Sequence, residues 1–222
     1  MPQSKSPLPA RPRGAALAAA LLAAALAGCG GSGSSAAAGG GARTSAPAPA
    51  GGAGASTAAQ SPVPAESNPP GDIPDTTVYV TYQSPAGHFR LKVPEGWSRK
   101  SAPASSTFTS NLNSITTAWM PMAAAPTVGS ARATTVRALQ ASTLAFRLQS
   151  VRAVSLAGGP AVELIYQVNS APNPVTGRQY RLVIDRFEFY RKGQGSVLSL
   201  SSAVGSDNVD PWRIVSESFR WK

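Results

Sequence analysis

The stretch YRLVIDRFEFYRKGQGSVLSLSSAV, residues 180–204, decides the fold class. Residues 180–192 are rich in aromatic and β-branched side chains, which favour strands. The Gly-Gln-Gly sequence at 193–195 predicts a turn, and the alternating leucines that follow predict a second strand over residues 197–204. The stretch therefore predicts two long antiparallel strands joined in a hairpin.

The apolar positions of the first of these strands change phase part-way along it. Leu182 and Ile184 occupy even positions, whereas Phe187 and Phe189 occupy odd ones. Successive side chains of a strand point to opposite faces, so a strand with a single buried face needs an extra residue to turn all four inward. We therefore predict a β-bulge near Asp185.

Weaker patterns of the same kind predict a helix and further strands earlier in the chain. Val136, Leu139, Thr143 and Phe146 recur at helical spacing, and they predict a helix over residues 133–147. The strands predicted from β-branched, aromatic or alternating residues cover 78–82, 88–93, 106–109, 115–120, 151–156 and 162–168.

The C-terminal residues predict a second helix. Trp212, Val215 and Phe219 fall on one apolar stripe, and Asp207 or Asp210 is placed to cap the helix N-terminus. Hairpins, a middle helix, a run of long antiparallel strands and a closing helix together indicate an α+β protein.

Outside this part of the chain, the N-terminus predicts export. Residues 1–28 have a basic start, an apolar core and small residues at the end, which is the plan of a secretory signal peptide. The tetrad Leu26-Ala27-Gly28-Cys29 resembles the lipobox of bacterial lipoproteins, which implies that the Cys29 thiol carries a diacylglyceryl group. The other interpretation is a cysteine that follows an ordinary signal peptide by chance. With the anchor, we expect a protein held at the cell membrane on its extracytoplasmic side.

Composition divides the rest of the chain in two. Residues 29–76 are nearly all Gly, Ala, Ser, Pro and Thr after the cysteine, and such a segment buries too little apolar surface to order itself. We predict a disordered linker here, although a glycosylated stalk or a wall-threading segment has a similar composition. Residues 77–222 are long enough for one globular domain with one core.

Three segments of this domain resemble the PsbP-like α/β/α sandwich superfamily. They are FRLKVPEGW at 89–97, GGPAVELIY at 158–166 and IVSESF at 214–219. Together with the lipobox and the Ala/Pro-rich linker, the chain is similar to actinobacterial lipoproteins of the LpqN and LpqT type. The resemblance implies a central antiparallel sheet with helices on its faces, used for docking onto partners, and it brings no catalytic residues with it.

Few residues of the domain predict chemistry. The chain has one histidine, His88, and one cysteine, so a Ser-His-Asp site would depend on His88, and a set of three or four metal ligands is not expected. Asp185 and Glu188 are the closest acidic pair within a strand and would point to opposite faces unless a bulge intervenes. The simplest interpretation is a solvated face on which they pair with Arg186 and Arg191. We expect no catalytic residue, no metal and no cofactor.

Charge is the more informative signal. Residues 77–222 hold sixteen Lys or Arg against seven Asp or Glu, a balance of +9. Arg90, Lys92, Arg99 and Lys100 form a first basic group. The residues predicted to contact an anionic surface form a second group: Arg178, Arg181, Arg186, Arg191 and Lys192. Nucleic acid is not an expected partner, because the export signal separates the protein from it.

These observations predict a lipid-anchored extracytoplasmic binding or scaffolding protein that is not an enzyme. Its partner would be another protein or an anionic component of the envelope. Two alternatives stay open. A hydrolase or transferase acting on envelope lipids or glycans would place His88 in a pocket beside a serine and an acid, and a lipid-binding carrier would have an apolar cavity between sheet and helices.

Overall fold

The computed structural model describes residues 60–67 and 71–222. They belong to a compact unit of residues 51–222, and the other unit, residues 1–50, lies outside them. The predicted signal peptide, the lipobox and Cys29 are therefore outside the described residues. No helix of the described part of the chain is long and apolar enough to cross a membrane.

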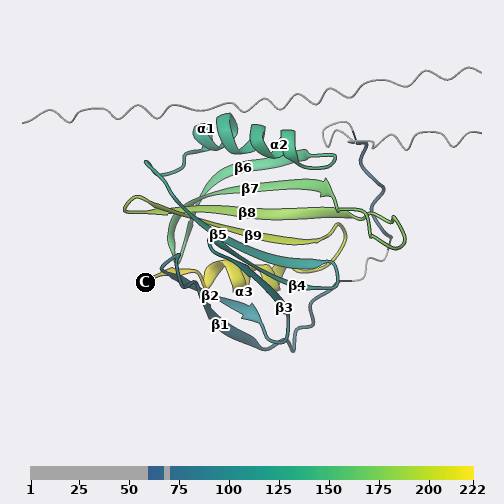
Figure 1. Ribbon diagram of the computed structural model, residues 1–222, viewed down its shortest axis with the longest axis horizontal. Coiled ribbons are helices and arrows are strands. Elements are labelled where there is room, and N and C mark those ends of the chain that lie inside the picture. The colour runs from purple at the N-terminus through teal and green to yellow at the C-terminus, as the bar shows by residue number, and fades with distance from the viewer. Residues whose placement is uncertain (1–59, 68–70) are drawn as a thin grey trace, which may run out of the picture. The chain divides into compact units, whose positions relative to one another are not determined.

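A seven-stranded sheet forms the centre of the domain (Figure 1). Every neighbouring pair of strands is antiparallel, including the predicted hairpin of β8 and β9. In spatial order the strands are β3 (Ser98–Ala102), β4 (Ser105–Ser110), β5 (Asn113–Pro121), β9 (Gln194–Ala203), β8 (Arg181–Arg191), β7 (Gly159–Asn169) and β6 (Arg147–Leu156).

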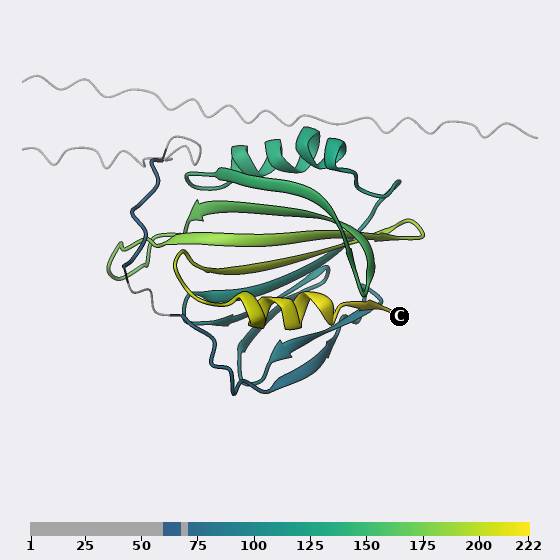
Figure 2. The same ribbon diagram turned by 180° about the vertical axis from the view of Figure 1, so that it is seen from behind.

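Each face of this sheet is covered by a different layer. A helical segment packs on one face, and a small three-stranded sheet and a second helix pack on the other (Figures 1 and 2). The helical segment is α1 (Val128–Ser130), the π-helical η2 (Ala131–Val136) and α2 (Arg137–Ser142). The opposite layer is β1 (Tyr79–Gln83), β2 (Phe89–Pro94), β10 (Arg220–Trp221) and α3 (Val209–Glu217). The predicted α+β class, a central antiparallel sheet flanked by helices, is confirmed.

The β-bulge predicted near Asp185 is wrong, because β8 pairs with β7 and with β9 without any shift of register. Its apolar residues change phase since both faces of the strand are buried. Ile184 packs in the core under the helical segment, whereas Phe187 and Phe189 pack in the core under β2 and α3. A register shift occurs on β6 instead, beside Leu148.

The predicted middle helix has shifted bounds. It begins earlier than residue 133, because the Thr127 and Ser130 side chains form a capping box ahead of it. It ends at Ser142, and Ala145 then adopts a positive φ of 50° that turns the chain into β6. Phe146 lies beyond the helix and still packs with its ring centroid 5.3 Å from that of Tyr166.

Two strands were not predicted, and their residues explain why. β3 is exposed along its whole length and has the polar sequence SRKSA, which carries no apolar alternation. β10 is two residues long and pairs with the start of β2. Both are edge strands, and their pairing comes from the neighbouring strand more than from their own composition.

The described part of the predicted linker packs against the domain. The Val63 amide donates to Asn169 Oδ1 at 3.0 Å, and the Ile73 amide donates to Asn208 Oδ1 at 2.8 Å. The Ile73 side chain is buried at 5% exposure. The segment that contacts the domain therefore starts ahead of residue 77, at residue 60 of the described chain.

Candidate functional site

A cleft opens between α3 and the sheet face formed by β6, β7, β8 and β9. Its volume is about 640 Å³, and residues of α3 form its roof. Figure 2 shows α3 lying on this side of the sheet. Apolar side chains of the sheet, Val154, Leu156 and Phe187, line part of its floor. Val215 on α3 and Phe219 after the helix are fully buried in the core, and the cleft lies beside them.

The charged part of the floor is a row of three side chains from three strands. Arg152 on β6 lies opposite Glu163 on β7 and binds it through two guanidinium nitrogens. The Glu163 residue is 4% exposed, whereas most of the Arg152 side chain is accessible. Asp185 on β8 completes the row. A buried carboxylate held by a two-point guanidinium contact is fixed in position.

Asp185 is the member of the row without a partner. Its Oδ1 atom is buried and has no hydrogen-bond partner among the described residues. Burial and, to a smaller extent, the charge of Glu163 raise the pKa of Asp185, the charge of Arg152 lowers it, and the net value is about 7. The carboxyl is therefore close to half protonated near neutral pH.

The roof of the cleft is held in place at the N-terminus of α3. Asn208 precedes the helix, although its side chain does not cap it, and neither Asp207 nor Asp210 is the N-cap residue predicted. Instead, the Asn208 side chain accepts from the Ile73 amide and donates to Gly71 O and Asn113 Oδ1. These contacts tie the helix start to the segment before β1.

Two further residues of the roof face the cleft. Trp212 on α3 lines it and stands edge-to-face with Trp97, at 6.3 Å between ring centroids. Ser206 also lines it, and the Ser206 Oγ atom is buried without a hydrogen-bond partner in the described part of the chain. Asp185 and Ser206, the residues that carry these two unpaired atoms, therefore both line the cleft beside an aromatic wall.

The structure separates the residues of the second basic group along β8. Arg178 precedes the strand and pairs with Glu66. Arg181 is 4% exposed and donates to Ala145 O at 2.8 Å, so it is an interior residue. Arg186 is bound to Glu188 at 3.1 Å. These three cations already have partners within the protein.

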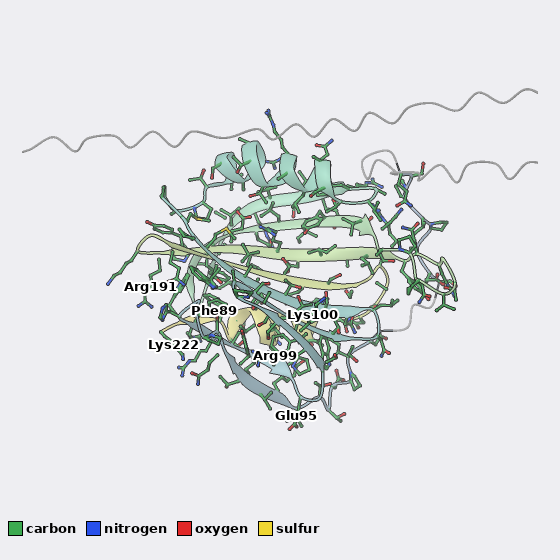
Figure 3. The ribbon with its side chains drawn as sticks, in the orientation of Figure 1. Phe89, Glu95, Arg99, Lys100, Arg191 and Lys222 are labelled. Atoms are coloured by element: carbon green, nitrogen blue, oxygen red, sulfur yellow. The ribbon has the colours of Figure 1, made fainter. Side chains whose placement is uncertain are left out.

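Arg191 and Lys192, the other members of that group, lie at the far end of β8 and meet cations from elsewhere in the chain. The Gln194 side chain, next to Arg191 in the hairpin, donates to Gly87 O. The Lys222 amide donates to the neighbouring His88 O at 2.8 Å, so the hairpin and the C-terminus meet at the same turn. Figure 3 shows Arg191 and Lys222 at this end of the domain. We call this surface the basic end: Arg90, Lys92, Arg191, Lys192, Arg220 and Lys222.

A groove of about 460 Å³ lies between β2 and α3, next to the basic end. Arg90, Lys92, Arg213 and Arg220 line it, and Glu217 is the one acidic residue there. Of the first basic group, Arg90 and Lys92 therefore belong to the basic end. Arg99 instead lies over the Tyr82 ring, 4.8 Å from its centroid, and Lys100 lies next to it on β3.

His88 does not line the cleft. It is exposed at the turn between β1 and β2, with a positive φ of 49°. The serines and acids of the cleft come from β6, β7, β8, β9, the segment before α3 and the C-terminal end of α3. The arrangement of His88, serine and acid that a hydrolase would need is not assembled by these residues.

The cleft itself was not predicted from the sequence. Asp185 was interpreted as one of a solvated pair, but it faces the cleft with Glu163 and Phe187. Its position in the strand could have indicated this. Asp185 occupies the same alternating positions as Phe187 and Phe189, so its side chain lies on the same buried face of β8 as theirs. An acid in a buried phase indicates a site more strongly than an acid in a solvated phase.

No protein-family model and no curated protein matches the chain. Among solved structures, the cyanobacterial PsbP (CyanoP) of Synechocystis sp. PCC 6803 matches at 15% identity and a TM-score of 0.47, over 68% of this chain and 98% of that one. LpqN of Mycobacterium tuberculosis, described as involved in cell envelope biogenesis, matches at 13% identity and a TM-score of 0.41, over 66% and 85%. The Ran-binding protein Mog1p of Saccharomyces cerevisiae matches at 8% identity and a TM-score of 0.48, over 66% of this chain and 96% of that one.

CyanoP and LpqN are proteins of the kinds that the sequence resemblance named. All three likenesses have TM-scores below 0.5, so they carry no argument about what this chain binds. The candidate sites rest on the geometry of the chain itself.

Proposed function

We propose that this chain is a lipid-anchored extracytoplasmic binding protein that presents its basic end to an anionic polymer of the envelope. Cys29 is the proposed anchor, and the domain has no catalytic role in this proposal. The observation that carries it is the placement of two features at opposite ends of β8. Residues 60–67 contact the domain at one end of this strand, and the basic end lies at the other (Figure 1).

The basic end is remote from the place where the chain enters the domain. β8 has eleven residues, which span about 35 Å at roughly 3.3 Å per residue. The chain enters the domain beside Arg178, through the Gln60 and Glu66 contacts. The chain therefore joins the domain at the end of β8 that is remote from the basic end, and this placement leaves the basic end accessible to a polymer.

The charges of the basic end suit a flexible polyanion. In the described chain no ion pair involves Arg90, Lys92, Arg191 or Lys192, so their charges face solvent uncompensated. Cations spread over an exposed surface attract a chain of repeated negative groups by roughly 1 kcal/mol for each well-placed residue. This attraction weakens with salt, because exposed charges are screened within about 10 Å at 0.1 M ionic strength.

The two alternatives have less support from the geometry. A hydrolase would use His88 as its base, and His88 is exposed outside the cleft. A carrier for acyl chains would need an apolar cavity, whereas the floor of the cleft carries Arg152, Glu163 and Asp185. Burying an ionisable group against a hydrocarbon chain costs free energy unless that group is paired.

The experiment measures polyphosphate binding by the full-length protein in neutral detergent. The test variant carries Arg191→Glu with Lys192→Glu, and the control carries Arg137→Glu with Arg147→Glu, two exposed residues on α2 and β6. Both variants change the net charge equally. We expect the test variant to lose about tenfold or more in affinity at low salt, since roughly 1.4 kcal/mol corresponds to tenfold.

Equal losses in the two variants, or no polyphosphate binding by the parent protein, would show that the basic end is not a binding surface. A parallel arm uses vesicles of anionic lipid. If the basic end supports vesicle binding and not polyphosphate binding, the partner is a headgroup surface and the proposal is wrong. In cell fractions, a Cys29→Ser variant that stays with the membrane would contradict the anchor.

A further inference from the structure

The acidic residues of this basic domain are concentrated at one place. Residues 77–222 contain seven acids, and three of them, Glu163, Asp185 and Glu217, line the cleft beneath α3. Arg152 and Arg213 also line it, but Arg152 is bound to Glu163, and Arg213 is bound to Asp210 and lies 3.9 Å from Glu217. With Asp185 ionised, the lining residues carry one more negative charge than positive charges.

The two unpaired atoms of the cleft point to a ligand that donates hydrogen bonds. Buried polar atoms in folded proteins have partners in the great majority of cases, so each exception calls for an explanation. Asp185 Oδ1 and Ser206 Oγ are both buried and unpaired in the described chain, and both residues line this one cleft. An ionised Asp185 carboxyl can only accept hydrogen bonds, and the Ser206 hydroxyl accepts them as well.

The remaining walls suit an apolar group attached to such a donor. Trp212 forms one wall, and Val154, Leu156 and Phe187 provide apolar floor beside Asp185. A volume of about 640 Å³ falls in the range of small-molecule sites, which runs from roughly 300 to 1,000 Å³. A cation near the face of a tryptophan gains further attraction from the ring.

We propose that the cleft beneath α3 binds a small organic ammonium, with its cationic nitrogen at Asp185 and its apolar part against Trp212 and Phe187. This cleft shares Arg213 and Glu217 of α3 with the groove next to the basic end, but its contact at Asp185 does not depend on the proposed polymer contact. It gives the domain a second binding activity, toward a cation of low molecular weight.

Other classes of ligand fit this set of residues less well. A divalent metal prefers several oxygen ligands, but the Glu163 carboxylate is already held by two nitrogens of Arg152. An anion would meet an excess of carboxyl groups. A neutral alcohol of the same shape would gain hydrogen bonds and would not gain the charge attraction, and it therefore provides the matched control.

Binding should be coupled to a proton. The charged groups lining the cleft beside Asp185 are Arg152 on β6, Glu163 on β7, and Arg213 and Glu217 on α3. Because the pKa of Asp185 is raised to about 7 in the empty cleft, the ammonium binds the ionised form and displaces the proton below that pH. Affinity should therefore fall as the pH is lowered from 8 to 6.

The experiment compares benzylammonium with benzyl alcohol, using nuclear magnetic resonance titrations of the full-length protein in neutral detergent at fixed ionic strength. The test variant is Asp185→Asn, which keeps the shape of the side chain and removes its charge. The control is Glu188→Gln on the opposite face of the same strand, where Glu188 is held by Arg186 and Thr135.

We expect benzylammonium to shift the Trp212 indole signal at pH 8, and Asp185→Asn to weaken its binding about tenfold or more, as for the loss of a charge-assisted hydrogen bond. Glu188→Gln should retain the parent affinity. Equal affinities for the ammonium and the alcohol would overturn the proposal, and so would an Asp185→Asn protein that binds benzylammonium as the parent does. Polyphosphate binding by Asp185→Asn should be unchanged, so the two proposals can fail independently.

Discussion

Asp185 and Glu188 lie three residues apart on β8 and have opposite surroundings. Glu188 faces the helical segment, where it is 5% exposed, accepts from Arg186 at 3.1 Å and accepts from Thr135 at 3.0 Å. Asp185 faces α3, where its Oδ1 has no partner among the described residues. One face of the strand therefore pairs its buried acid, and the other leaves it unpaired beside a cleft.

The two acids differ because the two faces of the sheet are packed differently. Under the helical segment, Leu164, Tyr166 and Ile184 pack together in one core cluster. Under α3, Val215 and Phe219 are fully buried, and the cleft lies beside them. A buried acid that is already paired stabilises the fold, whereas an unpaired acid can still accept hydrogen bonds from a ligand.

The largest expected effect comes from neutralising each acid in turn and measuring the free energy of unfolding at pH 8. Asp185→Asn should stabilise the protein by about 2 to 4 kcal/mol, because each unit of a raised carboxyl pKa corresponds to about 1.4 kcal/mol of destabilisation when ionised. Glu188→Gln should destabilise it by about 2 kcal/mol, since Arg186 loses a charged partner. Effects of the same sign at both positions would contradict the comparison.

The stabilisation by Asp185→Asn should depend on pH with a definite sign. The folded state holds the Asp185 proton up to about pH 7, whereas the ordinary value is 3.8, so the folded parent binds more protons in between. The contribution of Asp185 to the parent protein's free energy of unfolding therefore falls as the pH rises from about 4 to about 7. The advantage of the variant should grow over that range and level off above it.

A smaller effect is expected from the hydroxyl groups that accompany the two acids. Thr135→Val removes the donor to Glu188 and should cost about 1 kcal/mol. Ser206→Ala removes an unpaired buried hydroxyl, so it should leave stability within about 0.5 kcal/mol of the parent or raise it. Denaturant unfolding of both variants checks this, and a large loss in Ser206→Ala would reveal a partner for its hydroxyl.

The strands and their pairing could be predicted in large part from the sequence. The β8–β9 hairpin and the predicted positions of β1, β2, β4, β5 and β7 agree with the structure, because apolar alternation and turn residues are local signals. The bulge near Asp185 was mispredicted because the pattern was interpreted with one buried face. Which layers cover a sheet depends on residues far away in the chain.

The sites were predictable to a smaller extent. Arg191 and Lys192 could be recognised as exposed cations, but their neighbour Lys222 arrives through the pairing of β10 with β2. Arg181 has the same charge in the sequence and is buried against Ala145. The number of charged residues can be read from the sequence, but which of them are buried or paired depends on the fold.

The titration of the Asp185 carboxyl carbon, followed by nuclear magnetic resonance with Asp185→Asn for assignment, tests the central claim most directly. With the acid unpaired beside a cleft, the midpoint should lie near pH 7, the value to which burial and the charge of Glu163 raise its pKa against the opposing charge of Arg152. A midpoint near pH 4 would show that the carboxyl is solvated or paired, and it would contradict the account of the cleft.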